Sequence, residues 1–258
     1  MSFSATRFLE TLKLFNTKTY CPVCDSKDAG FNPLSDFYRT HAEQYGYVHF
    51  GKGEMTALDT YSCTKCGASD RERLYAFWVA KYYSKQRKNL ASKAIHFAPE
   101  AVLSAKLKES RVFSDYQTAD LMMEHVDHKV DLLHLPFAEE TYDFFICSHV
   151  LEHVYDDRAA MRELLRVLTK TGCGILMAPI IVGLPATVED PSITDEGERW
   201  RLFGQDDHVR LYSHNEFVSR IKESGFNLQQ YDQSYFGAPL FKKLGLKPSS
   251  ILYVVSKS

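Results

Sequence analysis

Four cysteines in two closely spaced pairs carry the most specific chemistry in this sequence. Cys21 and Cys24 form one C-x-x-C pair, and Cys63 and Cys66, followed by Gly67, form a second. A C-x-x-C turn brings two thiolates to one metal ion, and two such turns complete a tetrahedral site. Because four sulfur ligands leave no open position, we predict a structural zinc site and not a catalytic one.

Other interpretations of these cysteines remain open. His41 and His49 lie between the pairs and would be ligands only if one cysteine pair were unused. The four cysteines could also be ordinary thiols or a redox motif, although paired spacing favours zinc. Cys147 and Cys173 lie singly in apolar runs and are expected in the core.

Ser148 and His149 stand where a buried strand is expected to end. The apolar run at 144–147 suits a strand buried on both faces. A helical pattern and a second apolar run at 175–181 follow, which predicts a parallel strand–helix–strand unit. Ligands bind beyond the carboxyl ends of such strands. We therefore expect Ser148 and His149 to face a pocket.

The helix of this unit should begin and end at recognisable residues. Asp156 or Asp157 can cap its start, and leucines recur at helical spacing behind them. Gly172 follows the last periodic residue, where a left-handed C-cap is expected. Glu152 and His153 precede the helix, and they could either brace it or line the pocket.

Carboxylates recur at the ends of the other predicted strands. A strand at 94–97 leads into Glu100, and the next strand ends at Asp120. The interval between these acids, about twenty residues, is the one that separates a cofactor loop from a ribose-binding carboxylate. Asp131 is the next acid in the series.

The stretch 182–212 has no clean helical or strand period, which favours a binding loop. Its run of polar residues suggests that Asp207, His208 and Arg210 bind an acceptor, with Gln205 and Tyr212 beside them. His208 is the best candidate for a general base, because an imidazole titrates near neutrality. A solvated polar loop is the alternative.

Two arginines begin a helix predicted from Asp70 to Lys88. Arg71 and Arg73 could lie in a solvated first turn, or one of them could reach a ligand carboxylate in the pocket. At the other end of the chain, Ser213 and Glu216 fit a capping box, and a closing strand is expected at 251–255.

Composition limits the classes of protein. The 258 residues are 45% hydrophobic, and 33 acids against 31 bases give a net charge of −2. Nucleic-acid binders usually carry a strong basic excess, so this balance argues against one. No apolar run reaches the roughly 20 residues of a membrane helix. We expect a cytoplasmic protein with reduced cysteines.

Several motifs together resemble a known family. The run LPFAEETYDFFICSHVLEHV, followed by RVLTKTG, is similar to class I S-adenosylmethionine-dependent methyltransferases, and most of all to the type 11 methyltransferase domain. The resemblance covers roughly Lys93 to Ser258. The cysteine module followed by RERL looks like a bacterial subgroup with a zinc-binding segment ahead of this domain.

The resemblance implies a fold and an order of domains. The fold would be α/β and Rossmann-like, a doubly wound, mostly parallel seven-stranded sheet with a small N-terminal zinc module built on the four cysteines. The zinc module, with an N-terminal helix, would cover 1–69, a connecting helix 70–92, and the methyltransferase domain 93–258 with a lid loop at 182–212. The closing strand would be antiparallel.

The resemblance also implies the cofactor and the residues that hold it. S-adenosylmethionine would lie with its methionine part against the first-strand loop, its ribose on the acid of the second strand, its adenine on the third segment and its sulfonium above the fourth strand. The matching residues are Phe97, Ala98, Pro99, Glu100, Asp120, Leu121, Asp131, Leu132, Ser148 and His149. The residues themselves, apart from the resemblance, predict His208, Asp207 and His149 as catalytic and Gln205, Arg210 and Tyr212 as ligands of the acceptor.

One departure from the family keeps other functions open. The glycine-rich loop of the family is replaced by HFAPE, which contains no glycine. We expect methyl transfer to an oxygen or nitrogen of a small hydroxylated acceptor such as a sugar, without a catalytic metal. A non-catalytic zinc-dependent binding protein on a degenerate methyltransferase fold, or an RNA methyltransferase, are the alternatives.

Overall fold

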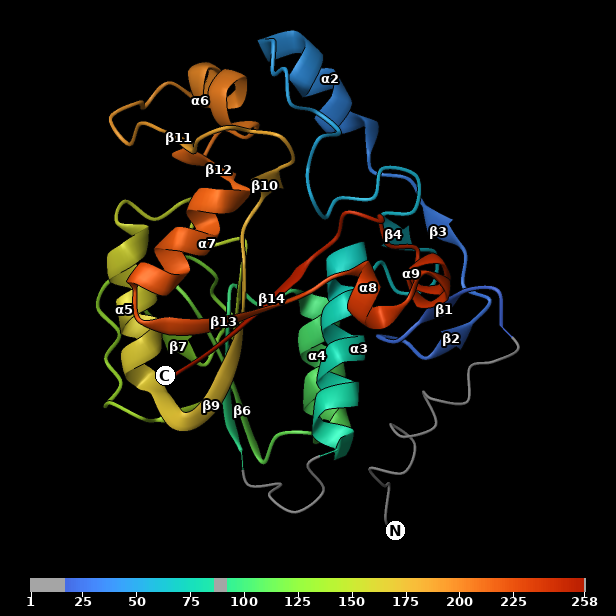
Figure 1. Ribbon diagram of the computed structural model, residues 1–258, viewed down its shortest axis with the longest axis vertical. Helices are drawn as coiled ribbons and strands as arrows, with labels where there is room; N and C mark the ends of the chain where they lie inside the picture. Colours follow the sequence, from blue (N-terminus) through green and yellow to red (C-terminus); the bar gives the residue numbers. More distant parts are fainter. Residues whose placement is uncertain (1–16, 86–91, 258) are drawn as a thin grey trace.

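A seven-stranded sheet forms the centre of the protein (Figure 1). The computed structural model describes residues 17–85 and 92–257, so the helix predicted near the N-terminus lies outside the described residues. The strand order is β13-β14-β9-β8-β5-β6-β7. The strand bounds are β5 Lys93–Phe97, β6 Asp115–Asp120, β7 His128–Lys129, β8 Tyr142–Ser148, β9 Leu168–Met177, β13 Phe226–Tyr231 and β14 Leu252–Lys257.

The sheet is mostly parallel, as predicted. Strands β9, β8, β5, β6 and β7 run parallel, and β14 pairs antiparallel with both β9 and β13. The four apolar residues at 144–147 in β8 are at most 1% exposed. Such burial requires cover on both faces, which confirms the predicted Rossmann-like α/β fold class.

Helices cover both faces of this sheet. Figure 1 shows α3 and α4 on one face and α5 and α7 on the other. The bounds of these helices are α3 Asp70–Lys85, α4 Ala101–Ser110, α5 Asp157–Val167 and α7 His214–Glu223. Helices α8 Gln233–Phe236 and α9 Ala238–Leu244 lie between β13 and β14. The described residues contain no helix that is both long and apolar enough to cross a bilayer.

From residue 17 to the start of α3, the described chain forms short strands and one helix. The elements of this N-terminal part are β1 Tyr20–Cys21, β2 Ser26–Lys27, β3 Phe31–Asn32, α2 Asp36–Tyr45 and β4 Ser62–Cys63. Helix α2 lies beside the helix of the 182–212 stretch in Figure 1, and the rings of Tyr45 and Trp200 stack with centroids 6.0 Å apart. The predicted domain boundaries stay predictions.

The structure corrects three local predictions. Helix α5 ends at Val167 and β9 begins at the next residue, so Gly172 lies within a strand and does not cap a helix. The 182–212 stretch is not irregular, because β11 Val188–Glu189, α6 Glu196–Phe203 and the start of β12 Arg210–Ser213 lie in it, with β10 Ile180–Ile181 just before. Ser213 precedes α7 without a side-chain cap, since Glu216 accepts from the Thr187 backbone N–H instead.

A close approach between β8 and β9 explains a glycine in the core of the sheet. Gly174 pairs with Phe145, and a Cβ on Gly174 would lie 2.4 Å from the Phe145 ring, which is fully buried. No real side chain fits at that distance unless the ring moves.

We therefore expect Gly174→Ala to lower the free energy of unfolding by about 1–3 kcal/mol, measured by urea denaturation. Gly53→Ala is the matched control, because a Cβ there meets only Thr56 at 3.5 Å, an ordinary contact. Equal midpoints for the two variants would contradict this account of the packing.

Candidate active site and metal centres

The carboxyl ends of three parallel strands bring the predicted cofactor residues together. Phe97, the last residue of β5, pairs with Ala119 in β6 and with Cys147 in β8. Asp120 and Ser148, which follow these partners, therefore lie beside the loop that begins at Ala98. This is the edge of the sheet at which Rossmann-like folds bind ligands.

The glycine-free loop adopts a backbone conformation that glycine would favour. Ala98 has a φ of 47°, in the left-handed region, and its N–H donates to the Ala119 carbonyl at 2.9 Å. A left-handed residue with a Cβ costs roughly 1–2 kcal/mol. The sheet thus holds this turn in a left-handed form without the residue type that makes it easy.

Glu100 is tied into an ion-pair network at the end of this loop. Its carboxylate lies 3.0 Å from His96 Nε2 and 3.3 Å from Arg71 Nε. Burial raises the pKa of Glu100, but the His96 hydrogen bond and the nearby Arg71 guanidinium outweigh burial and hold that pKa at about 2. Arg71 also lines a cavity at this edge of the sheet, so it is not part of a solvated first turn.

Asp120, Asp131 and Ser148 are each held by local hydrogen bonds. Asp120 Oδ1 accepts from the backbone N–H groups of the two residues at 122–123, and Asp131 Oδ1 accepts from Leu133 N–H at 2.9 Å. The Ser148 hydroxyl lies 3.0 Å from the Tyr75 hydroxyl in the core. Of the apolar cofactor candidates, Phe97 and Leu132 are buried, whereas Leu121 is 59% exposed.

A cavity of about 390 Å³ lies between the sheet, the 182–212 stretch and the N-terminal part. Its volume falls in the range of small-molecule sites. Aromatic side chains form much of its wall, namely Tyr38, Tyr47, Phe50, Tyr61 and Phe203. Its polar lining includes Arg71, His149, Glu152, His153, Gln205, Asp207 and His208. The structure therefore places the predicted residues His149, Gln205, Asp207 and His208 around one cavity.

A buried carboxylate lies at the centre of the polar wall. Glu152 is 0% exposed, and neither of its carboxylate oxygens receives a hydrogen bond from the described residues. Its Oε1 lies 3.3 Å from His149 Nδ1 and 3.9 Å from the Nε2 atoms of His153 and His208. Burial raises the pKa of Glu152, but the surrounding imidazoles outweigh burial and hold it below the usual range.

The histidines of this cluster differ in burial and in partners. Burial lowers the pKa of His208 to about 4, so its imidazole is neutral at neutral pH, and its Nδ1 has no hydrogen-bond partner in the described chain. Burial also lowers the pKa of His149, which has a left-handed φ of 57°. His153 is more exposed, and its Nδ1 lies 3.3 Å from Asp207 Oδ2.

Two predicted acceptor ligands lie elsewhere. Arg210 is 2% exposed and donates to the carbonyls of Leu151 at 2.5 Å, Val154 and Tyr155 at 2.8 Å. Tyr212 is fully buried and donates to Asp157 Oδ2 at 2.6 Å. Neither side chain lines the cavity; Arg210 instead fixes the turn that carries Glu152 and His153.

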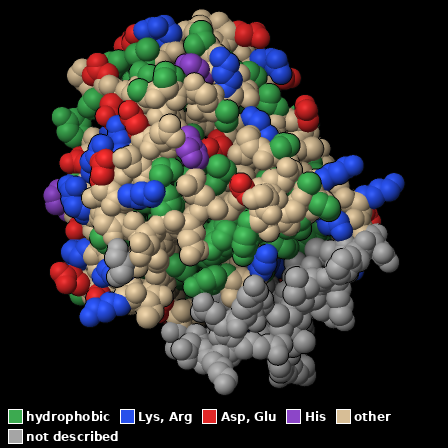
Figure 2. Space-filling view, viewed as in Figure 1, with side chains coloured by type: hydrophobic (Ala, Val, Ile, Leu, Met, Phe, Trp, Pro, Cys, Tyr) green, Lys and Arg blue, Asp and Glu red, His purple; other side chains and the backbone are tan. Residues whose placement is uncertain are grey.

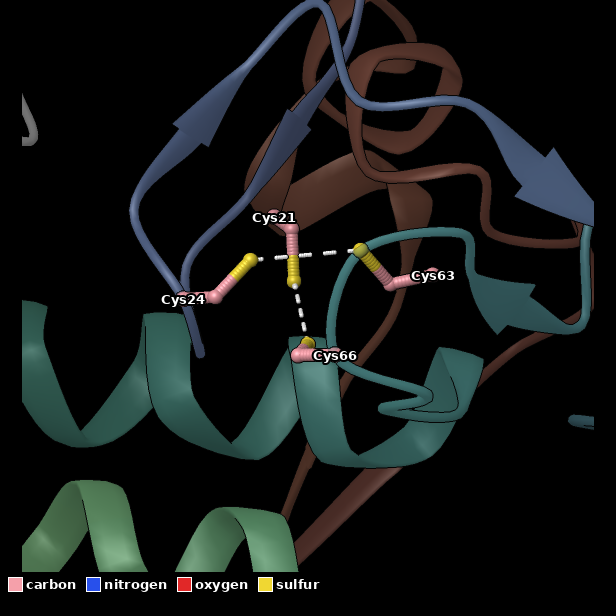
Figure 3. A group of neighbouring side chains, drawn as sticks. All are labelled: Cys21, Cys24, Cys63 and Cys66. Carbon is pink, nitrogen blue, oxygen red and sulfur yellow. Dashed lines mark hydrogen bonds between the residues drawn. The ribbon is translucent and has the colours of Figure 1, made fainter.

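The four paired cysteines also come together (Figure 3). Their sulfur atoms converge from two loops near the start of α3, with Cys21 Sγ 3.7 Å from Cys66 Sγ and Cys24 Sγ 3.9 Å from Cys63 Sγ. A zinc ion with four sulfurs at about 2.3 Å sets them roughly 3.8 Å apart, so the spacing fits a tetrahedral metal site. None of the four forms a disulfide.

Among the residues that the structure describes, two groups bring metal-ligand atoms within 4.8 Å of one another. One group is the cysteine quartet, and the other is Glu152, His153 and His208. The competing ligand His41 belongs to neither group; its Nδ1 lies 2.8 Å from the Phe37 carbonyl in α2.

Comparison with known proteins assigns the central part of the chain. Residues 78–176 match the sequence profile of a methyltransferase domain, the type 11 family. The matched residues 78–176 form a methyltransferase domain, which supports an S-adenosylmethionine-dependent methyltransferase as the class of enzyme. The predicted family and class of enzyme are thereby confirmed, while the acceptor is not determined.

Several solved structures are similar to this methyltransferase at low sequence identity. The [4+2]-cyclase SpnF is 13% identical, over 88% of this chain and 97% of its own, with a TM-score of 0.48. The YcgJ protein from Bacillus subtilis is 14% identical, over 70% and 98%, with a TM-score of 0.44. A possible histamine N-methyltransferase from Thermotoga maritima is 14% identical, over 73% and 96%, with a TM-score of 0.40. A search of curated proteins gave no match.

Sequence reasoning gave too little weight to three residues of the methyltransferase. Glu152 and His153 were as readily assigned to bracing α5, although their adjacency to His149 was a usable signal. Arg73 was expected either in solvent or at a ligand. It is 0% exposed and donates to backbone carbonyls of both the cysteine loop and the α9 end, among them Ala68 at 2.8 Å and Leu244 at 2.7 Å.

The clamp made by Arg210 gives a testable consequence. Arg210→Lys removes the planar fork that serves three backbone carbonyls, one of them buried and two partly buried, so we expect the free energy of unfolding to fall by about 2 kcal/mol. Arg201→Lys is the control, because that side chain pairs with Glu198 on the surface and should give no measurable change. Chemical denaturation that shows equal stability for both variants would refute the clamp.

Proposed function

We propose that this protein transfers a methyl group from S-adenosylmethionine to an oxygen of a small hydroxylated acceptor bound in the aromatic-walled cavity. The observation that carries the proposal is the placement of His149. It follows the last residue of β8 at the cofactor edge of the methyltransferase sheet and also lines the cavity. One residue thus joins the donor side to the acceptor side.

The cofactor would lie across the ends of β5, β6 and β8. The loop Phe97–Glu100 would hold the methionine part, and Asp120 would accept hydrogen bonds from the ribose hydroxyls. Asp131, Leu121 and Leu132 would meet the adenine, with Ser148 and His149 under the sulfonium. The left-handed Ala98 supports retention of the site, because the backbone makes its turn without glycine.

The side chains on the acceptor side of the cavity would align the acceptor and remove its proton. The acceptor oxygen forms a bond to the methyl carbon as the carbon–sulfur bond breaks, and the electron pair of that bond stays on sulfur. Because sulfonium is already an excellent leaving group, alignment and proton removal are the main tasks of the protein. His208, neutral and buried beside Glu152, would take the proton of the acceptor hydroxyl.

The remaining cavity residues would orient the acceptor. Gln205 offers an amide, and Asp207 fixes the ring of His153. Aromatic walls with a few convergent polar groups are typical of sites for small molecules. A sugar fits this description, because its ring can stack on aromatic side chains while its hydroxyls reach the histidines.

The alternative of an RNA substrate finds little support. In Figure 2 the basic and acidic side chains of one face are interspersed, without a large area of one sign. The net charge of −2 agrees with this distribution. RNA binding draws most of its affinity from clustered positive charge.

Calorimetry with S-adenosylhomocysteine tests whether the methyltransferase fold still binds its cofactor. We expect wild-type binding, weakened about tenfold or more by Asp120→Asn, because this change removes the carboxylate charge and keeps the oxygen that caps the 122–123 turn. Asp115→Asn, at the opposite end of β6, is the control and should bind normally. No wild-type binding at millimolar ligand would leave only a non-catalytic binding protein.

We also propose that the four cysteines hold a structural zinc ion that orders the N-terminal part. Cys24→Ser should remove one zinc equivalent per chain, as counted by plasma mass spectrometry, and lower the melting temperature. Cys173→Ser, a core thiol outside the quartet, should keep the wild-type zinc content. Unchanged zinc in Cys24→Ser would exclude a metal at this site.

A further inference from the structure

The wall of the cavity contains a second group of possible metal ligands, formed by Glu152, His153 and His208. Two of these side chains, Glu152 and His208, are buried, and both leave polar atoms without hydrogen-bond partners among the described residues. A buried, unpaired carboxylate is costly unless a positive charge meets it. A buried group of polar atoms without hydrogen-bond partners is what a cation site requires.

We propose that Glu152, His153 and His208 bind one divalent transition-metal ion, which in turn coordinates the acceptor hydroxyl. The proposal rests on the methyltransferase function proposed above and adds the means by which the acceptor is held. Two histidines and one carboxylate are a common ligand set for Zn²⁺, Fe²⁺ and related ions. Three protein ligands leave open positions for a substrate oxygen.

The distances suit such an ion after a small adjustment. The Nε2 atoms of His153 and His208 each lie 3.9 Å from Glu152 Oε1. Ligands at about 2.1 Å from one ion lie roughly 3.0–3.4 Å apart, so each of these two pairs would close by about 0.5–0.9 Å. Rotation of the imidazole rings supplies a shift of this size.

The surroundings of the group resemble those of established metal sites. His153 Nδ1 faces Asp207 Oδ2 at 3.3 Å, and a proton shared there leaves the lone pair of Nε2 free toward Glu152. Histidine ligands usually donate their other ring nitrogen to a carboxylate or carbonyl in this way. Asp207 is thus a positioning residue for His153.

The backbone holds the three ligands in place from two directions. Arg210 fixes the turn that carries Glu152 and His153 through the carbonyls of Leu151 and Val154. The N–H of Val209, next to His208, donates to the Glu152 carbonyl at 2.9 Å. The ligands therefore come from two chain segments that are already joined before any ion binds.

A metal at this site changes the assignment of the general base. With His208 as a ligand, the ion lowers the pKa of the coordinated acceptor hydroxyl and acts as a Lewis acid. His149, 3.3 Å from Glu152 and outside the ligand group, is then the residue left to take the proton. Loss of turnover in His208→Ala would fit either role, so metal binding must be measured directly.

Titration with Mn²⁺ of the purified protein carrying one zinc equivalent per chain, enough for the cysteine site only, measures the second site when followed by electron paramagnetic resonance. Mn²⁺ prefers nitrogen and oxygen ligands, so it leaves a zinc–thiolate site undisturbed. We expect one bound Mn²⁺ per wild-type chain, none in Glu152→Gln or His153→Ala, and about 10–100-fold weaker binding in Asp207→Asn. His49→Ala, a cavity histidine outside the group, should bind as the wild type does.

Zinc content and cofactor binding separate the possible failures. Unchanged zinc at the cysteines shows that a variant has folded, and His153→Ala changes a partly exposed side chain. No bound Mn²⁺ in the wild type, or equal binding in wild type and Glu152→Gln, overturns the proposal even when S-adenosylhomocysteine binds normally. Mn²⁺ binding that needs Glu152 supports the proposal, and a simultaneous lack of S-adenosylhomocysteine binding would count only against the methyltransferase function.

Discussion

The buried charge of Glu152 is the constraint on which most of the site depends, because the neighbouring groups must compensate for it. Moving a carboxylate out of water costs several kcal/mol unless the surroundings compensate, and this one receives no hydrogen bond from the described residues. Its turn is held by Arg210 from behind, and its oxygens face histidines from two segments. His149, which lies 3.3 Å from Glu152, has a left-handed φ of 57°. Such concentrated strain and burial mark functional sites.

The N-terminal part is a wall of this site and not an appendage. The ring of Tyr47 leaves no room for a Cβ on Gly204, and Glu54 accepts hydrogen bonds from Tyr253 and His214 of the main sheet region. Short strands and one helix bury too little apolar surface to order themselves unaided. A metal at the cysteines would fix the shape of the segment that closes the cavity. Structural metal binding and acceptor binding are then coupled through packing.

The parts of the fold that depend on local sequence pattern could be predicted from the sequence. We could predict the positions of three features from local pattern alone: the apolar run of β8, the acid at the end of β6 and the paired cysteines. Arg73 and Arg210 could not be placed in this way, because long charged side chains are normally exposed. Their burial depends on carbonyls brought together from distant segments, such as Ala68 and Leu244 around Arg73. Helix α6 was missed because eight residues carry too weak a period.

The glycine-free loop has a backbone conformation typical of glycine although no glycine is present. Glycine is favoured in such loops because it reaches positive φ without strain and admits a ligand close to the backbone. Ala98 reaches positive φ with a strain of roughly 1–2 kcal/mol. The hydrogen bond to Ala119 holds the loop on one side, and the contacts of Glu100 with His96 and Arg71 hold it on the other. A loop fixed in this way can keep its shape without glycine, and the loss of a sequence motif is then no measure of the loss of a site.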